Sequence, residues 1–235
     1  MALFAISDLH LSLGGEKPMD IFGSEWEGHH LKIKENWIKT VSDNDLVILG
    51  GDLCWAMKLE DAQQDFDFIH QLPGKKVLFK GNHDYWWQSY SKVVRALPED
   101  LHAIQNNYFG YENGIAICGT RGWTIPGEHC SEQDMKIFKR EKMRLELSLA
   151  KAQNDGFKKF IVTLHYPPFM RYEEDEGFAE IMKKYNVKIC LYGHLHGADH
   201  QRAYTGEKEG INYYFISCDY LDFKPLRLDL GNIWR

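Results

Sequence analysis

The sequence predicts an α/β fold in which most strands run parallel. Five short apolar runs recur along the chain, and a segment with helical spacing of its apolar residues separates most consecutive pairs. Strands that alternate with helices form parallel sheets, because each helix returns the chain to the same starting edge. Polar side chains suited to binding metal or transferring protons follow each of the five runs directly.

The composition is that of a globular protein with a sizeable core. Hydrophobic residues make up 44% of the 235 positions and charged residues 26%, which is ordinary for a soluble domain. This length suits one large α/β domain as well as two small ones. No internal repeat, linker or low-complexity segment interrupts the sequence, so we expect a single domain over residues 1–235.

Charge, cysteine content and the first residues predict an environment. The net charge of −6 lacks the basic field that nucleic-acid binding usually needs. No apolar run approaches the ~20 residues of a membrane span, and residues 1–6 resemble a first strand more than a signal peptide because they lack a basic start. Five cysteines without a C-x-x-C pair indicate reduced thiols. We therefore expect a cytoplasmic protein.

The first strand is expected over residues 2–6, which are mostly apolar, as in a buried strand. Asp8 and His10 follow two positions apart, so in an extended segment both side chains point to one face. They could form a two-ligand clip. The segment 11–30 that comes next is rich in glycine and long for a loop without a function. It either covers a site or packs as an ordinary surface loop.

The next two strands also end in polar residues. The run 46–49 leads through two glycines to Asp52, and the glycines allow a close approach of backbone at the strand end. The run 75–80 leads to Gly81 and then to an amide, an imidazole and a carboxylate in succession: Asn82, His83 and Asp84. Such side chains suit a site that binds metal and moves protons better than they suit a core.

The second half of the chain repeats the pattern. Short strands are expected within residues 102–118, followed by strands at 160–164 and 188–192. The first of these later strands leads to His165 and the second to the pair His194 and His196. Two more strands, 213–217 and 226–230, are expected to close a second sheet.

Helices are expected where apolar residues recur every three or four positions, as Ile33, Trp37 and Val41 do. An acidic run at 173–176 suits the solvated start of the last helix, because acidic residues stabilise helix N-termini. The five expected helices cover residues 31–41, 58–71, 89–96, 132–154 and 177–185.

Two further features each allow two interpretations. Trp86 and Trp87 form part of an aromatic group after Asp84, which we expect to be a hydrophobic plug that fixes the loop, with substrate stacking as the alternative. Arg121 follows a strand in a loop flanked by glycines. It could contact a phosphate or be an ordinary surface arginine.

The polar residues converge if the strands are parallel, because ligands then bind at the carboxyl ends of the strands. The donors are oxygen and imidazole without thiolate, which suits Mn, Fe, Co, Ni or Zn. They are too many for one tetrahedral ion, and Asp52, which arrives alone between the paired ligands, is the natural bridge between two ions. A two-metal site about 3.5–4 Å across favours in-line displacement at phosphorus by a metal-bound hydroxide.

The blocks D-x-H, G-G-D, G-N-H-D, a single later H and G-H-x-H occur in this order over residues 4–197. In this the sequence resembles the calcineurin-like metallophosphoesterase superfamily, and in particular small bacterial predicted phosphohydrolases of uncertain substrate. The resemblance implies a four-layer αββα sandwich of two mixed sheets flanked by helices.

The resemblance also implies roles for the residues. One metal would be held by an oxygen- and imidazole-rich set: Asp8, His10, Asp52 and His196. The other would be held by Asp52, Asn82, His165 and His194. His83 would contact the phosphate and assist the leaving group, and Asp84 would hold the ring of His83.

The expected function is therefore the hydrolysis of a phosphomonoester or phosphodiester, with a small soluble substrate favoured and two transition-metal ions as cofactors. A phosphoprotein phosphatase is the alternative, because Arg121, Arg171 and Arg202 could receive a phosphopeptide. A non-catalytic metal-binding scaffold is a further alternative, since a fold does not fix a function. The oligomeric state is left open.

Overall fold

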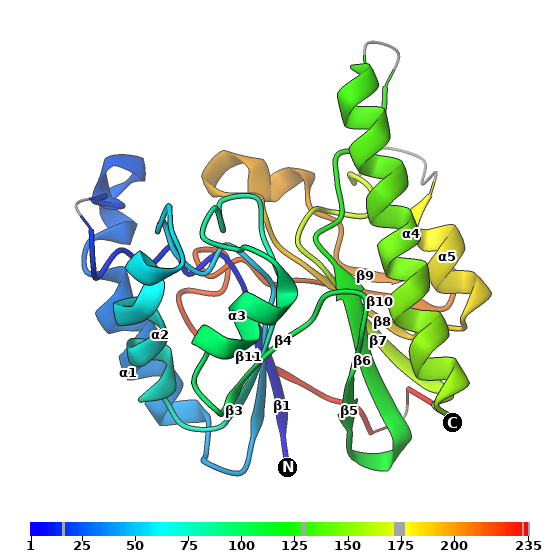
Figure 1. The fold of residues 1–235 in the computed structure, drawn as a ribbon, viewed down its shortest axis with the longest axis horizontal. Coiled ribbons are helices and arrows are strands. Elements are labelled where there is room, and N and C mark those ends of the chain that lie inside the picture. The colour runs from blue at the N-terminus through cyan, green and yellow to red at the C-terminus, as the bar shows by residue number, and fades with distance from the viewer. Residues whose placement is uncertain (16, 128–129, 172–176, 232, 235) are drawn as a thin grey trace.

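A computed structural model describes residues 1–15, 17–127, 130–171, 177–231 and 233–234. The predicted fold is confirmed: two mixed β-sheets pack face to face, and helices cover their outer faces (Figure 1). The acidic run predicted to start the last helix, residues 173–176, lies outside the described residues.

The first sheet has five strands in the order β11-β1-β2-β3-β4. Its four parallel strands pair as neighbours, and β11 pairs antiparallel with β1. The strands are β1 (Leu3–Ile6), β2 (Leu46–Leu49), β3 (Lys75–Leu78), β4 (Leu101–Ala103) and β11 (Leu226–Leu228).

The second sheet has six strands in the order β5-β6-β7-β8-β10-β9. Its four central strands are parallel and its two edge strands are antiparallel to their neighbours. The strands are β5 (Phe109–Tyr111), β6 (Ile115–Thr120), β7 (Lys159–Leu164), β8 (Ile189–Tyr192), β9 (Gly206–Lys208) and β10 (Ile211–Phe215).

The prediction that both closing strands belong to the second sheet is half wrong. β10 joins the second sheet beside β8, but β11 crosses to the first sheet, where Leu226 pairs with Ala5. The apolar spacing of β11 predicts a strand but carries no information on its partner, since any open sheet edge accepts it.

The strands read as continuous apolar runs because both faces of each sheet are covered. Phe4 and Ile6 pack with Ile33 and Trp37 of the neighbouring helix in one core. Leu3 and Ala5 instead pack against strands of the second sheet in a core between the sheets. A third core lies between the second sheet and its own helices.

The helices lie close to the predicted ranges. The longest, α4, begins after Ser131, whose side chain accepts a hydrogen bond from the amide of Asp134 as an N-cap. In Figure 1, α1, α2 and α3 lie beside the first sheet, and α4 and α5 lie beside the second. The α-helices are α1 (His29–Thr40), α2 (Gln63–His70), α3 (Tyr90–Ala96), α4 (Glu132–Asn154) and α5 (Phe178–Lys184).

Short 3-10 turns complete the described chain. Two of them shape the segment predicted as a long loop after His10. They are η1 (Asp20–Phe22), η2 (Ser24–Trp26), η3 (Glu60–Ala62), η4 (Glu112–Gly114) and η5 (Gly197–Arg202). In the described part of the chain, no helix combines the length and the apolar character that crossing a membrane requires.

Candidate metal centre

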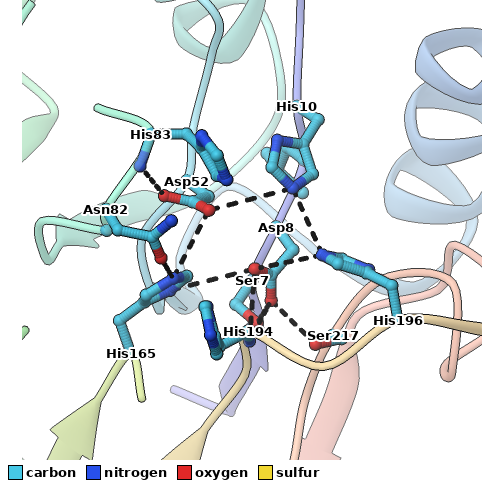
Figure 2. Close-up of polar contacts among 12 residues, drawn as sticks. Ser7, Asp8, His10, Asp52, Asn82, His83, His165, His194, His196 and Ser217 are labelled. Carbon is cyan, nitrogen blue, oxygen red and sulfur yellow. Dashed lines mark hydrogen bonds and ion pairs between the residues drawn. The ribbon is translucent and has the colours of Figure 1, made fainter. Parts of the chain in front are cut away.

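The polar residues that follow five parallel strands meet where the two sheets approach each other (Figure 2). Backbone hydrogen bonds join the strand ends: the amide of Asp8 donates to the carbonyl of Gly51 (2.9 Å), and that of His10 donates to the carbonyl of Asp52 (3.0 Å). A parallel bridge between Ser7 and Ser217 connects the first sheet to the chain after β10. The predicted convergence is therefore present in the structure.

Asp8, His10 and His196 form one group that could hold a metal ion. The Nε2 atoms of His10 and His196 are 3.3 Å apart, and His196 Nε2 is 3.6 Å from Asp8 Oδ1. Both aspartate and histidine are common ligands of divalent transition metals.

Asp8, Asp52 and His165 form a second such group, so the two groups share Asp8. His165 Nε2 lies 3.4 Å from Asp52 Oδ2 and 2.7 Å from Asn82 Oδ1. Asp52 Oδ2 is also 3.9 Å from His10 Nε2. Asp52 thus belongs to the second group and also lies near His10 of the first, and its predicted role as the bridging ligand stays a prediction.

His194 is close to these groups without being part of either. Its backbone amide donates to Asp8 Oδ1 (3.2 Å). Its ring lies edge-on to His165, with 5.1 Å between the centroids, and 4.0 Å from the ring of Tyr166. Its predicted role as a metal ligand stays a prediction.

The backbone at four of the predicted ligands has a strained conformation. Asp8, His10, Asp52 and His194 have φ values of 60°, 44°, 51° and 75°. Non-glycine residues rarely adopt positive φ, and each such residue costs about 1–3 kcal/mol and tends to occur at functional sites. The strain turns each side chain out of its strand end toward the shared centre.

Two glycines allow the strand ends to approach. A Cβ atom on Gly81 would overlap Asp52 Oδ1, and one on Gly193 would overlap the side chains of Ser7 and Asp8. Any side chain at either position would therefore displace a carboxylate of the centre.

The charges of the centre suit a divalent cation. Burial by itself would raise the pKa of Asp8 and Asp52, but neighbouring imidazoles lower both, that of Asp52 to about 2. Burial opposes protonation of His165 and His196, but the facing carboxylates raise their pKa to about 9 and about 10. Burial lowers the pKa of His10 to about 4, leaving the neutral form that binds metals. A cation would take the place of the protons on His165 and His196.

A second set of residues, not predicted from the sequence, holds these ligands in place. Ser217 Oγ donates to Asp8 Oδ2 (2.8 Å), as does Ser7 Oγ. Asp219 accepts from His196 Nδ1 (3.0 Å) and from His200 Nε2 (2.9 Å). A signal was available, because Ser217 and Asp219 follow an apolar run just as the predicted ligands do.

His83 lies at the edge of the centre, half-buried. Its amide donates to Asp52 Oδ1 (2.7 Å), and its Nδ1 is 3.4 Å from the hydroxyl of Tyr85. The ring of Trp55 lies 4.5 Å away, centroid to centroid. Burial lowers the pKa of His83, which favours the neutral imidazole.

Asp84 does not make the contact that the resemblance implied. Its Oδ2 accepts from the amides of Gly81 (2.7 Å) and Asp52 (2.9 Å). Its Oδ1 accepts from the amide of Leu53 (2.8 Å) and from Trp86 Nε1 (3.0 Å). Asp84 therefore ties the loop after β3 to the loop after β2, and the expectation that it holds the ring of His83 is corrected, because the tight turn points it under its own loop.

The aromatic plug interpretation is confirmed. Trp86 is completely buried and packs against Phe66, with 4.9 Å between the ring centroids. Trp87 is buried too, and its Nε1 donates to Gln105 (3.0 Å).

Arg121 is turned toward α4. Its guanidinium lies 4.4 Å from the centre of the Trp123 ring, and its Nη2 is 3.9 Å from Oε1 of the buried Glu141. Its carbonyl accepts from the amide of His165 (2.9 Å), which positions that histidine. A phosphate contact by Arg121 stays a prediction.

Solved structures share this architecture. A protein of unknown function from Aquifex aeolicus is 18% identical, with a TM-score of 0.55 over 96% of this chain and 95% of that one. The phosphopantetheinyl hydrolase PptH from Mycobacterium tuberculosis is 14% identical, with a TM-score of 0.61 over 100% of this chain and 98% of that one. At these identities the likeness concerns the fold. No curated protein matches the chain.

The family comparison reaches further than the fold. The model of the calcineurin-like phosphoesterase family matches residues 1–198, which include every predicted ligand. Together with the clustered carboxylates and imidazoles, this match shows that the chain belongs to the calcineurin-like phosphoesterase family and is a metal-dependent phosphoester hydrolase.

Proposed function

We propose that the chain hydrolyses a small phosphomonoester or phosphodiester with the help of two metal ions. The observation that carries the proposal is the pair of adjacent ligand groups, with the buried carboxylate of Asp52 between a histidine of each: its Oδ2 is 3.9 Å from His10 Nε2 and 3.4 Å from His165 Nε2. A carboxylate that serves two cations is the usual core of a dinuclear phosphoesterase site, where the ions supply Lewis-acid charge and acidify water.

In this proposal, Asp8, His10, Asp52 and His196 hold one ion. The other ion is held by Asp52, Asn82, His165 and His194. The donor set suits Mn, Fe, Zn, Co or Ni. The hydrogen bonds to Asp8 and His196 from the residues after β10 would fix both ligands, as outer hydrogen bonds do in known metal sites.

The role of His83 is that of a proton donor. If the hydroxyl of Tyr85 donates to His83 Nδ1, the neutral ring carries its proton on Nε2. We propose that, once the ring has also been protonated at Nδ1, the Nε2 proton passes to the oxygen of the leaving group and the ring returns to its neutral form, which is general acid catalysis. Asp84 takes no direct part in the proton transfer. It holds the loop that carries His83.

Two wider predictions belong to the same proposal. Residues 1–235 would act as one domain, because β11, near the end of the chain, pairs with β1, near its start. The protein would work in the cytoplasm, because its five cysteines, four of them buried, are usual in a reducing compartment.

The test is a hydrolysis assay after metal reconstitution, with an aryl phosphomonoester, an aryl phosphodiester and a panel of nucleotides. We expect Asp52→Asn and His83→Ala to abolish turnover with an intact fold, and His30→Ala, on α1, to retain it. Elemental analysis should find two metal ions per chain, and fewer in Asp52→Asn. Full activity of either site variant would refute the mechanism.

A further inference from the structure

A pocket opens directly beside the candidate metal centre. It has a volume of about 270 Å³. Three of its lining side chains, His10, His83 and His196, belong to the centre itself. A phosphate bound between those histidines would therefore direct its ester substituent into this pocket. The remaining lining residues are Met19, Phe22, Glu25, Trp26, Trp55 and Gly197.

Two tryptophans give the pocket rigid aromatic walls. The ring of Trp55 stacks on His10, with 4.9 Å between centroids and an interplanar angle of 22°. Trp26 is buried, meets the rings of His10 and His196 edge-on, and rests against Phe223 at 5.4 Å. Aromatic faces and edges in this arrangement favour a flat apolar group.

Two more lining residues, Met19 and Phe22, come from the segment after His10, as Trp26 does. Met19 is buried and its sulfur accepts from Trp55 Nε1 (3.1 Å). Phe22 leaves 61% of its surface exposed at the rim of the pocket. At the rim, the ring of Phe22 offers apolar surface to a ligand in the pocket.

Among the described residues that line the pocket there is no lysine or arginine to pair with a second anion. Apart from the histidines of the centre, the ionisable lining residue is Glu25, an acidic one. Lys17 lies 4.6 Å from the centre of the Trp55 ring but lines a neighbouring cavity. A leaving group bearing a phosphate or carboxylate would meet repulsion here.

We propose that this aromatic pocket binds an uncharged aromatic substituent of the substrate, so that the enzyme selects phosphoesters of neutral aromatic alcohols. The inference rests on the proposed function and names its substrate class. A cavity of about 150 Å³ accommodates benzene, so the pocket has room for one ring with a short linker.

Three alkyl phosphomonoesters test the selection without large differences in leaving-group reactivity: benzyl phosphate, ethyl phosphate and 2-carboxyethyl phosphate. For the metal-replete enzyme we expect kcat/KM for the benzyl ester to exceed that for the ethyl ester about tenfold, as apolar pockets discriminate. The carboxyethyl ester should be the poorest of the three.

Variants of the lining residues test whether the pocket causes the preference among the three esters. Phe22→Ala should reduce the benzyl-to-ethyl ratio of kcat/KM, and Glu25→Lys should raise turnover of the carboxyethyl ester. Ile21→Ala is the matched control: Ile21 is 73% exposed in the same turn but does not line the pocket, so the ratios should stay those of the parent.

Binding of phenylphosphonate and methylphosphonate, measured by calorimetry, separates this inference from the proposed function. Tighter binding of phenylphosphonate than of methylphosphonate, with a smaller difference in Phe22→Ala, supports the aromatic pocket. If none of the esters is hydrolysed, the proposed function is refuted, but this binding result still supports the pocket. Equal affinity for the two phosphonates, or equal kcat/KM for the three esters, overturns the pocket.

Discussion

Replacing Asp84 by asparagine should destabilise the whole protein, because its carboxylate joins the loops after β2 and β3 by hydrogen bonds. It is completely buried, and its two oxygens accept four hydrogen bonds, from three backbone amides and Trp86. An asparagine side chain retains one oxygen and places an NH₂ group where the other was. Two of the four donors then face another donor and lose their acceptor.

The magnitude follows from those two orphaned donors. A buried donor without a partner costs about 1–3 kcal/mol, so two of them cost about 4 kcal/mol when each is taken near the middle of that range. For a chain of 235 residues, each kcal/mol lowers Tm by about 2–4 °C, so Asp84→Asn should lower Tm by about 8–16 °C.

The assay is thermal unfolding with a chelator present, so that lost metal affinity does not contribute. His83→Ala is the informative comparison, because Asp84 makes no described contact with the ring of His83 and the alanine variant should unfold near the parental Tm. If Asp84→Asn leaves Tm unchanged and alters only the pH profile of hydrolysis, Asp84 does not stabilise the contact between the two loops. That result would instead support the role of orienting His83.

Three other predictions concern parts of the molecule around the centre. Asp219→Asn should weaken metal affinity about 10–100-fold in a chelator competition, whereas Asp199→Asn, an exposed neighbour on η5, should not. Asp100→Asn should cost about 3 kcal/mol in urea unfolding, because it removes the charged partner, 2.6 Å away, of the buried Lys76 ammonium, which keeps a neutral partner in the carbonyl of Leu72. Although burial raises the pKa of Asp100, the hydrogen bond from Lys76 holds it below its ordinary value, so this stability should be present at neutral pH and lost on acidification. A thiol reagent should label one cysteine per native chain, Cys130, since the other four are buried.

The sequence predicts the strands and the residues at their ends because both signals are local. An apolar run such as 46–49 identifies a buried strand by itself, and parallel order follows from the helices between the runs. Asp52 and His165 are 113 positions apart and follow strands of different sheets, yet Asp52 Oδ2 and His165 Nε2 lie 3.4 Å apart, because the two sheets meet at the carboxyl ends of these strands.

Contacts that depend on the path of a loop could not be predicted. The turn that begins at Gly81 folds Asp84 beneath the loop, and nothing in the spacing of G-N-H-D distinguishes that position from one beside His83. The partner of β11 is similarly undetermined by its own sequence. The segment 11–30 allowed two interpretations, and residues 19–26 serve both, packing on the core through Trp26 and lining the pocket through Phe22.

The hydrogen bonds that Ser217 and Asp219 make with Asp8 and His196 involve residues outside the part of the chain that the family model matches. The family match ends at residue 198, but Ser217 and Asp219, which secure Asp8 and His196, lie beyond it. A protein shortened to the matched residues would keep every predicted ligand and lose the parts that immobilise two of them. The last 37 positions of the chain therefore belong to the working enzyme as much as the recognised motifs do.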